Sequence, residues 1–296
     1  MAYKSGFVAV VGRPNVGKST LLNRLLGEKI LIVSDKPQTT RNKIRCIYSE
    51  EGLQVIFLDT PGIHRPLHLL GDNLVQSALS SFYEVDQIWM LVEPDLEIGK
   101  GDRYIIDHFP KERGQVILVI NKVDISPDVN REQIATNYLR LYPFNRVFFI
   151  SALTGEGSEE LMQYLRSHLP EGPMYYPEDM IVDQPERFIV AEIVREKILH
   201  LTREEIPHSC AVLVEEMKES DELVRINATI YVERESQKGM IIGKQGSMLK
   251  EIGTLARIDI EALLGNRVHL ELWVKVRKDW RNKSEDLKHM GYRHEK

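Results

Sequence analysis

The residues most suited to chemistry lie near the N-terminus, where positions 12–20 read GRPNVGKST. This stretch contains the pattern G-x-x-x-x-G-K-[ST], whose glycines let backbone amides turn toward phosphate oxygens. The apolar run FVAVV precedes it and the helical pattern STLLNRLLG follows, which is the context that the pattern requires. We therefore predict a phosphate-binding loop rather than a structural glycine turn. Its residues are Gly12, Arg13, Pro14, Asn15, Val16, Gly17, Lys18, Ser19 and Thr20.

Three oxygen-bearing residues are expected to form a magnesium site beside this loop. Ser19 ends the phosphate-loop pattern at the position that ligates magnesium. Asp59 opens the motif DTPG after the apolar run VIFL and suits an indirect metal contact. The polar stretch KPQTTRN at 36–42 can order around the metal and a γ-phosphate, and there we expect Thr40, rather than Thr39, to be the ligand.

The same motifs supply groups for the γ-phosphate itself. Lys18 would reach the β and γ phosphates, and the backbone amide of Gly62 would meet the γ-phosphate. We therefore expect catalysis to depend on Lys18, Thr40 and Gly62. The residues of this motif expected to contact a nucleotide are Asp59, Thr60, Pro61 and Gly62.

The choice between adenine and guanine rests on NKVD at 121–124, which follows the apolar run VILVI. The motif therefore lies at the carboxyl end of a strand, where open α/β sheets bind ligands. The carboxylate of Asp124 can accept hydrogen bonds from N1–H and the 2-amino group of guanine, whereas adenine would leave it unpaired. Asn121 would support the loops and the base, and Lys122 would lie along the plane of the base. The stretch SAL can place a backbone amide near guanine O6, and its residues are Ser151, Ala152 and Leu153.

In this order, the five motifs resemble those of translation-factor-type GTPases over residues 1–170. The resemblance implies GTP, GDP and Mg²⁺ as ligands, and loops that the γ-phosphate orders and hydrolysis releases. One residue departs from the Ras-like pattern, because Ile63 stands where a glutamine would orient the attacking water. Isoleucine has no donor or acceptor for this role, so we predict slow intrinsic hydrolysis.

Two groups remain candidates for assisting the attacking water. His64 follows Ile63, although a single histidine in a loop is more often merely solvated. Asn15 resembles the asparagine that ligates potassium in some GTPases with the same departure. A K⁺ ion is therefore an alternative, and Asn15 is a candidate catalytic residue.

The pattern of apolar runs predicts the elements that must position these motifs. Through residue 170 the runs FVAVVG, VIFLDT, IWMLVE, VILVINK and VFFISA alternate with helical patterns such as EELMQYLRSHL. This alternation predicts an α/β P-loop GTPase domain, with a mostly parallel sheet and helices on both faces. The stretch CIYSEEGLQVIFLDT predicts a hairpin that adds one antiparallel edge strand.

A different organisation follows. Three prolines in a short acidic stretch, Pro173, Pro177 and Pro185, predict a linker at 173–186. Beyond it the patterns FIVAEIVREKIL, CAVLVEEM, RINATIYVE, two helical stretches and VHLELWVKV give the order helix, strand, strand, helix, helix, strand. We therefore expect a first domain at 1–172, an α+β domain at 187–280 and a basic C-terminal tail at 281–296.

A second glycine–lysine stretch, IIGKQG at 241–246, lies between the two central helices of the second domain. It is not expected to bind a nucleotide, because the pattern needs a glycine six residues before the lysine, where Lys238 stands before Lys244, and Gln245 replaces the Ser or Thr. The element order with G-x-x-G resembles a type II KH domain, whose loop holds about four single-stranded nucleotides. A plain glycine turn between packed helices is the alternative.

Each residue of this loop has an expected role in holding RNA. The glycines allow close backbone approach, Lys244 supplies charge, Gln245 supplies polar contacts, and Ile241 and Ile242 would form an apolar floor under the bases. The residues expected to bind RNA are Lys238, Ile241, Ile242, Gly243, Lys244, Gln245, Gly246, Lys250, Lys275 and Arg277.

Composition agrees with a soluble globular protein and hides a local asymmetry. The chain has 296 residues and a net charge of −5. Residues 178–235 carry 7 basic and 15 acidic side chains, whereas residues 236–296 carry 13 basic and 8 acidic ones. Such a basic segment suits an anionic partner. The two cysteines have no metal-ligand spacing, and no stretch approaches the roughly 20 apolar residues of a membrane span.

Over essentially the whole chain, a GTPase domain with GRPNVGKST, QTTR and DTPGIH and a KH domain with IIGKQG resemble the bacterial Era family. This resemblance implies binding to the 3′ end of 16S ribosomal RNA and assistance in assembling the small (30S) ribosomal subunit. It also implies a cytoplasmic location with peripheral contact at the inner membrane, and we expect a monomer.

Two other classes of function compete with this interpretation. A P-loop kinase would need an acceptor pocket and a basic lid, and NKVD and SAL disfavour it. A GTPase switch whose C-terminal domain engages mainly protein or membrane partners would use the basic stretch WRNKSEDLKHMGYRHEK.

Overall fold

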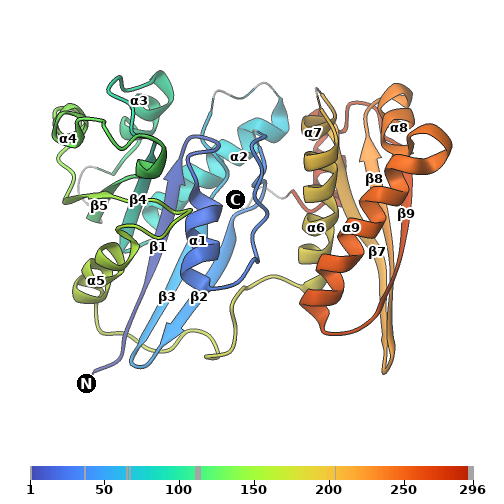
Figure 1. Cartoon of the computed structure of the whole chain (residues 1–296), viewed down its shortest axis with the longest axis horizontal. Helices are drawn as coiled ribbons and strands as arrows, with labels where there is room; N and C mark the ends of the chain where they lie inside the picture. Colours follow the sequence, from blue (N-terminus) through green and yellow to red (C-terminus); the bar gives the residue numbers. More distant parts are fainter. Residues whose placement is uncertain are drawn as a thin grey trace.

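The computed structural model describes residues 2–36, 38–64, 66, 68–110, 115–203 and 205–292. Within them the chain forms two bodies that lie side by side (Figure 1). The first has a six-stranded sheet and the second a three-stranded sheet. Among the helices of these residues, none is both long and apolar enough to cross a membrane.

The six-stranded sheet has the order β2-β3-β1-β4-β5-β6. All neighbouring pairs are parallel except β2 and β3, which form an antiparallel hairpin at the edge. Gly52 turns this hairpin with a φ of 77°. The strands are β1 Lys4–Gly12, β2 Ile44–Glu50, β3 Leu53–Asp59, β4 Gln87–Val92, β5 Gln115–Ile120 and β6 Arg146–Phe149. The predicted parallel strands and the antiparallel edge strand are thus confirmed.

Helices cover both faces of this sheet, so its strands are buried on both sides and need no alternation of polar residues. One core cluster joins the sheet to α1 (Lys18–Leu26) and α5 (Ser158–His168). A second cluster joins the opposite face to α2 (Leu69–Ser80), α3 (Lys100–Ile106) and α4 (Arg131–Leu139). Two short helical turns, η1 (Ser81–Tyr83) and η2 (Val123–Ile125), complete this body.

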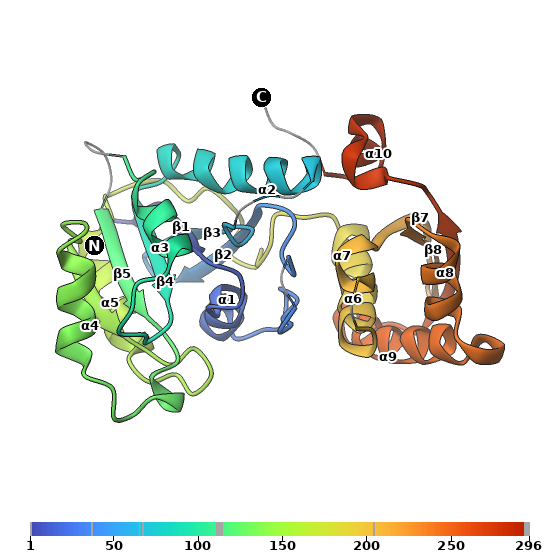
Figure 2. The same cartoon turned by 90° about the horizontal axis from the view of Figure 1, so that it is seen from above.

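The second body has the element order expected for a type II KH domain. In its sheet β7 and β8 are antiparallel, while β8 and β9 are parallel. Helices α6, α8 and α9 pack on one face of this sheet through a single apolar cluster (Figure 2). Its elements are α6 Glu186–Leu201, α7 Ile206–Ser209, β7 Ala211–Ser220, β8 Leu223–Val232, α8 Glu235–Ile242, η3 Lys244–Gly246, α9 Ser247–Leu264 and β9 Val268–Val276. The predicted fold class, a P-loop α/β domain followed by an α+β KH domain, is confirmed.

The segment between the two bodies is not a free linker. Its Ile181 carbonyl accepts from the amide of Ile47 at 2.8 Å, and its Asp183 amide donates to the carbonyl of Arg45 at 3.0 Å. The segment therefore pairs with the edge strand β2 and covers its unpaired backbone groups, as edge strands require.

The residues expected to form a basic tail are folded, as far as residue 292. They form the turn η4 (Trp280–Asn282) and the helix α10 (Ser284–His289). An apolar cluster joins this segment to α2 and to the sheet, and it contains Leu70, Leu74, Ala211, Tyr231, Trp280, Leu287, Met290 and Tyr292. Figure 2 shows α10 beside the end of α2. Residues 293–296 of the expected tail lie outside the described part of the chain.

Candidate functional site

The phosphate loop connects β1 to α1. Gly17 caps α1 with a φ of 100°, and a Cβ atom there would lie 2.2 Å from the side-chain nitrogen of Asn121. Lys18 is buried, and its Nζ donates to the carbonyl oxygens of Gly12 at 3.3 Å and Arg13 at 2.9 Å. Burial lowers the pKa of Lys18 to about 8, although the charge of Asp59 opposes this shift. A buried ammonium group of this kind favours an anionic ligand beside it.

The three residues predicted to hold magnesium converge. Ser19 Oγ lies 3.0 Å from Asp59 Oδ2 and 3.2 Å from Thr40 Oγ1, and Thr40 Oγ1 lies 3.3 Å from the same carboxylate oxygen. The neighbouring Thr39 hydroxyl instead donates to the carbonyl of Lys36 at 2.6 Å. The structure therefore brings Thr40, and not Thr39, to the predicted metal ligands.

The electrostatics of Asp59 also suit a cation. The residue has no exposed surface, and its Oδ1 is buried with no hydrogen-bond partner in the described part of the chain. Burial raises the pKa of Asp59 to about 6, against the opposing effects of Lys18 and the two hydroxyls. Magnesium prefers such hard oxygen donors, so this set of residues fits the ion.

At the base side, Asn121 joins two loops. Its Nδ2 donates to the carbonyl of Val16 at 2.7 Å, and its Oδ1 accepts from the amide of Ala152 at 2.8 Å. The neighbouring Asp124 has a buried Oδ1 without a hydrogen-bond partner among the described residues. Because an unpaired buried carboxylate oxygen is costly, a ligand with two adjacent N–H donors would be favoured there.

Charged side chains around this site are held by carboxylates. Lys122 has a φ of 66°, and its Nζ donates to Glu93 at the end of β4. Arg13 donates from Nε to Asp102 at 2.9 Å, a buried residue of α3 whose pKa is raised by its burial. The guanidinium of Arg13 is therefore directed at α3, and this residue offers its backbone rather than its charge to the loop.

A cavity of about 440 Å³ lies among these groups. Its lining combines the phosphate loop with the loop between α1 and β2 (residues 27–43, the α1–β2 loop), together with Gly62 and Lys122. At its rim Asn15 has a φ of 66° and donates from Nδ2 to the carbonyl of Asp35 at 2.6 Å. Most of the phosphate loop, the two hydroxyl residues Ser19 and Thr40 and the γ-phosphate residue Gly62 thus line one cavity, whereas Asp59 does not line it.

The DTPG motif is held against the phosphate loop. Thr60 Oγ1 donates to the carbonyl of Val10 at 2.8 Å, and the amide of Ile63 donates to the carbonyl of Gly12 at 3.1 Å. Gly62 leaves no room for a side chain, because a Cβ atom there would lie 2.7 Å from backbone atoms of Pro14. Ile63 itself is buried in the apolar core.

His64, the candidate for orienting water, lies beside a residue that sequence reasoning left out. Its Nε2 is 3.2 Å from Nε2 of Gln38, and Gln38 also lines the cavity. Gln38 has a positive φ of 61°.

The second glycine–lysine stretch forms a tight turn between α8 and α9. Gly243, Gln245 and Gly246 have φ values of 72°, 52° and 79°. Lys244 and Gln245 are exposed, as a contact surface requires, whereas Ile241 has no exposed surface and belongs to the core. The prediction that Ile241 forms an apolar floor under the bases is therefore wrong, because its side chain is covered by the core. Ile242 is half-buried, so the same prediction stands for this residue.

A groove next to this turn adds residues that sequence reasoning missed. It has a volume of about 400 Å³ between α9 and β9. It is lined by Gly246, Leu249, Lys250, Gly253, Thr254, Arg257, Leu270 and Leu272. The signal for it was available, since Gly246, Lys250, Gly253 and Arg257 follow helical spacing from the G-x-x-G stretch.

Two predicted RNA residues lie elsewhere. Lys275 belongs to the alternate set of β9, opposite to the set of Leu270 and Leu272 that lines the groove, and Arg277 follows the end of this strand. Arg277 also pairs with Asp286 of α10 at 2.6 Å. The structure brings Lys250, but not these two residues, to the groove.

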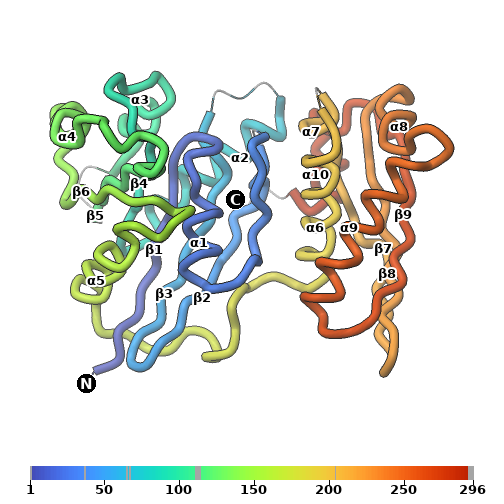
Figure 3. The backbone as a smooth tube through the Cα atoms, viewed as in Figure 1, coloured from blue at the N-terminus to red at the C-terminus, as the bar shows by residue number. Residues whose placement is uncertain are grey.

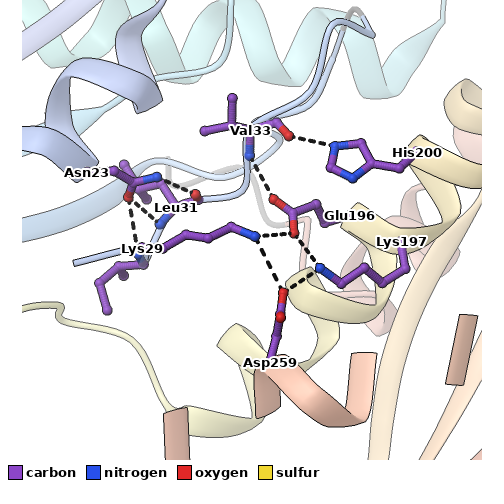
Figure 4. Close-up of polar contacts among 9 residues, drawn as sticks. Asn23, Lys29, Leu31, Val33, Glu196, Lys197, His200 and Asp259 are labelled. Carbon is purple, nitrogen blue, oxygen red and sulfur yellow. Dashed lines mark hydrogen bonds and ion pairs between the residues drawn. The ribbon is translucent and has the colours of Figure 1, made fainter. Parts of the chain in front are cut away.

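Charged contacts between the two bodies were not predicted from the sequence. Figure 4 shows Glu196 of α6 accepting from Lys29 Nζ at 2.8 Å and from the amide of Val33 at 3.1 Å. Asp259 of α9 lies 3.4 Å from Lys29, and His200 Nε2 is 2.9 Å from the carbonyl of Val33. The α1–β2 loop thus runs along α6, as the tube in Figure 3 also shows.

Family models match both bodies. Residues 7–122 match a family described as 50S ribosome-binding GTPase, and residues 205–281 match the KH domain. The chain is 54% identical to the GTPase Era of Staphylococcus haemolyticus, with 98% of this chain and 97% of the relative covered. It is 52% identical to the GTPase Era of Carboxydothermus hydrogenoformans, with 99% of each covered.

Solved structures agree over the whole length. A crystal structure of Era in complex with MgGDPNP and nucleotides 1506–1542 of 16S ribosomal RNA has a TM-score of 0.94 and 44% identity, covering 98% of this chain and 99% of that one. A variant of Aquifex aeolicus Era bound to GDP and tetrafluoroaluminate has a TM-score of 0.92 and 43% identity, with coverage of 98% and 99%. Sequence, fold and site geometry agree that this chain belongs to the Era family of GTPases.

Proposed function

We propose that this protein is a GTP-binding, slowly hydrolysing switch that binds the single-stranded 3′ end of 16S ribosomal RNA and assists assembly of the 30S subunit. The RNA and the nucleotide are supported by a related Era crystallised with MgGDPNP and nucleotides 1506–1542 of that RNA. The choice of guanine rests on Oδ1 of Asp124, which is buried without a hydrogen-bond partner among the described residues. Asp124 follows Asn121, whose side chain joins two loops of the site.

The chain's own residues have distinct parts in this mechanism. Lys18 and the turned amides of the phosphate loop bind the phosphate chain, and the amide of Gly62 meets the γ-phosphate. Ser19 and Thr40 would hold Mg²⁺, with Asp59 as an indirect partner. When bound, this ion neutralises charge on the β and γ oxygens.

Hydrolysis is slow because the residue after Gly62 cannot orient water. Ile63 is apolar and buried, so the alternatives are His64 with its neighbour Gln38, or a K⁺ ion near Asn15. Turnover in potassium chloride and sodium chloride at matched ionic strength separates them. Faster turnover in potassium chloride supports the hypothesis that K⁺ assists hydrolysis, and equal rates refute it.

The RNA site of this proposal is the G-x-x-G turn and the groove between α9 and β9. Exposed Lys244 and Lys250 provide charge, and Leu270 and Leu272 provide an apolar surface for bases. Replacing Gly243 and Gly246 with Asp tests the site. RNA binding should fall while GTP binding stays, and RNA binding that survives would refute the KH assignment.

Location and assembly state also follow from the family resemblance. We propose a cytoplasmic monomer with a GTPase domain at 1–172, a KH domain at 187–280 and peripheral contact at the inner membrane.

The membrane contact would use exposed lysines on the C-terminal segment, which suit an anionic lipid surface: Lys278, Lys283 and Lys288. Sedimentation with vesicles of increasing phosphatidylglycerol content measures this contact, and light scattering measures the mass. The alternative in which protein or membrane partners dominate predicts vesicle binding stronger than RNA binding.

A further inference from the structure

The residues on either side of Thr40 are both held by the second body. The carbonyl of Thr39 accepts a hydrogen bond from Nη2 of Arg195 on α6. The guanidinium of Arg41 donates to the carbonyls of Cys210 at 2.6 Å, Pro207 at 3.0 Å and His208 at 3.2 Å, at the end of α7. Thr40 therefore lies between two anchors that belong to the KH domain.

Arg195 is an unusual residue to find at this place. It has no exposed surface and is fixed by Glu192, which accepts from its Nε at 2.7 Å and from its Nη2 at 2.5 Å. Because the ion pair is buried and one helical turn supports both partners, the guanidinium has little freedom of its own. The backbone at Thr39 is thus bound to a rigid group.

This anchor lies one residue from the metal ligands. The hydroxyl of Thr40 is 3.2 Å from Ser19 and 3.3 Å from Asp59. A shift of the Thr39 carbonyl would move Thr40 with it, since one peptide unit joins them and is planar. The contact therefore bears on the geometry of the metal and γ-phosphate site.

We propose that Arg195 is a positioning residue, through which α6 of the KH domain holds Thr40 in place for the Mg²⁺ ion of a bound triphosphate. The inference rests on the proposed role of Thr40 as a magnesium ligand. In GTPase switches this loop is ordered by γ-phosphate and Mg²⁺ contacts and is released on hydrolysis. Loss of Arg195 therefore weakens binding of a triphosphate and leaves binding of a diphosphate unchanged. By reciprocity, bound triphosphate strengthens the docking of α6 against the loop by the same factor.

The test compares fluorescent GDPNP and fluorescent GDP in magnesium buffer, with the full chain. Arg195→Met is expected to weaken GDPNP by about 5- to 150-fold, the usual range of coupling between sites, and to leave GDP unchanged. The double variant Glu192→Gln, Arg195→Met removes both buried charges. It replaces the single variant in the same measurement if Arg195→Met does not fold, and the same selective loss of GDPNP affinity is expected. Arg166→Met is the control, an arginine of α5 whose hydrogen bonds go to Glu50 and Glu159.

Three results are distinguishable. A selective loss of GDPNP affinity, matched by Thr40→Ala and absent in Arg166→Met, supports the inference. Unchanged GDPNP affinity in the folded variants, or an equal loss of GDP affinity, overturns it. Unchanged GDPNP affinity in Thr40→Ala refutes the proposed magnesium role of Thr40 instead.

Discussion

At the scale of single residues, the nucleotide site contains two buried carboxylate oxygens that no described residue pairs. Asp59 Oδ1 and Asp124 Oδ1 are both buried without a hydrogen-bond partner among the described residues. Such atoms cost about 1–3 kcal/mol each, and more where they carry charge. Both belong to motifs that the sequence assigns to the nucleotide, so the cost indicates where ligand contacts are made.

The first prediction concerns Asp124. In Asp124→Asn one acceptor becomes an amide donor that opposes the donors of guanine, so GTP affinity should fall at least about tenfold, the effect of losing one charged hydrogen bond. Xanthine presents a carbonyl instead of the 2-amino group, so XTP affinity should rise. Competition against a fluorescent nucleotide measures both, with the exposed Asp128→Asn as control. Unchanged base preference would contradict the assignment.

At the scale of elements, the contact between α6 and the α1–β2 loop is organised by Glu196. The side chain is 1% exposed and accepts from Lys29, Lys197 and the amide of Val33. Burial acts to raise its pKa, but these three donors outweigh burial and hold the pKa below the usual 4.5. A carboxylate with a lowered pKa stabilises the folded state above its unfolded pKa and loses this contribution as the pH falls.

The second prediction follows from that sign. Glu196→Gln should cost about 1–3 kcal/mol of unfolding free energy at neutral pH. The difference from the parent protein should shrink as the pH falls below 4.5, because the parent then also loses the charge. Urea unfolding at several pH values measures it, with the exposed Glu132→Gln as control. A difference that is independent of pH would show that the charge of Glu196 is not responsible.

The C-terminal segment is a second contact between the bodies, and it is apolar. Leu287 of α10 is 1% exposed within the cluster that includes Leu70 and Leu74 of α2. Asn282 also accepts from the amide of Leu69 at 3.3 Å. The helix that follows DTPG is thereby in contact with the segment that follows the KH domain.

The third prediction concerns the contribution of this cluster to the free energy of unfolding. Leu287→Ala should cost about 2–5 kcal/mol, as for other buried leucines. The exposed Leu139→Ala should stay within about 0.5 kcal/mol of the parent protein. Denaturant unfolding measures both. Equal effects of the two substitutions would mean that the segment contributes nothing to the packing between α2 and the KH sheet.

The sequence predicted the strands and motifs because their signals are local. A phosphate loop is recognisable from glycine spacing, and VHLELWVKV alternates strictly in the printed sequence. The contacts between the bodies have no local signal, since Arg195 and Thr39 are 156 residues apart. The charged residues Arg195, Glu196 and Lys197 of α6 are buried, which no local feature of the sequence indicates. Arg41 lies within a motif recognised from the sequence, but its guanidinium donates to backbone carbonyls of the KH domain and not to the nucleotide site.

At the scale of the whole molecule, the α1–β2 loop and the helix α2 after DTPG both contact the C-terminal half of the chain. The α1–β2 loop does so through Arg41, Val33 and Thr39, and the helix after DTPG does so through the C-terminal segment. The G-x-x-G turn lies at the far end of the KH domain, at the outer end of α9 (Figure 1). Nucleotide state at one end can therefore bias how the RNA site at the other end is presented.

We propose that the nucleotide state controls the affinity of the KH domain for RNA. The most direct measurement is the affinity of the full chain for a single-stranded RNA with the sequence of the 16S 3′ end, with GDPNP and with GDP, at fixed salt. Tighter RNA binding is expected with GDPNP than with GDP, by a factor of about 5 to 150, and RNA should strengthen GDPNP binding over GDP binding by the same factor in the reverse titration. Identical RNA affinities in the two nucleotide states would contradict it.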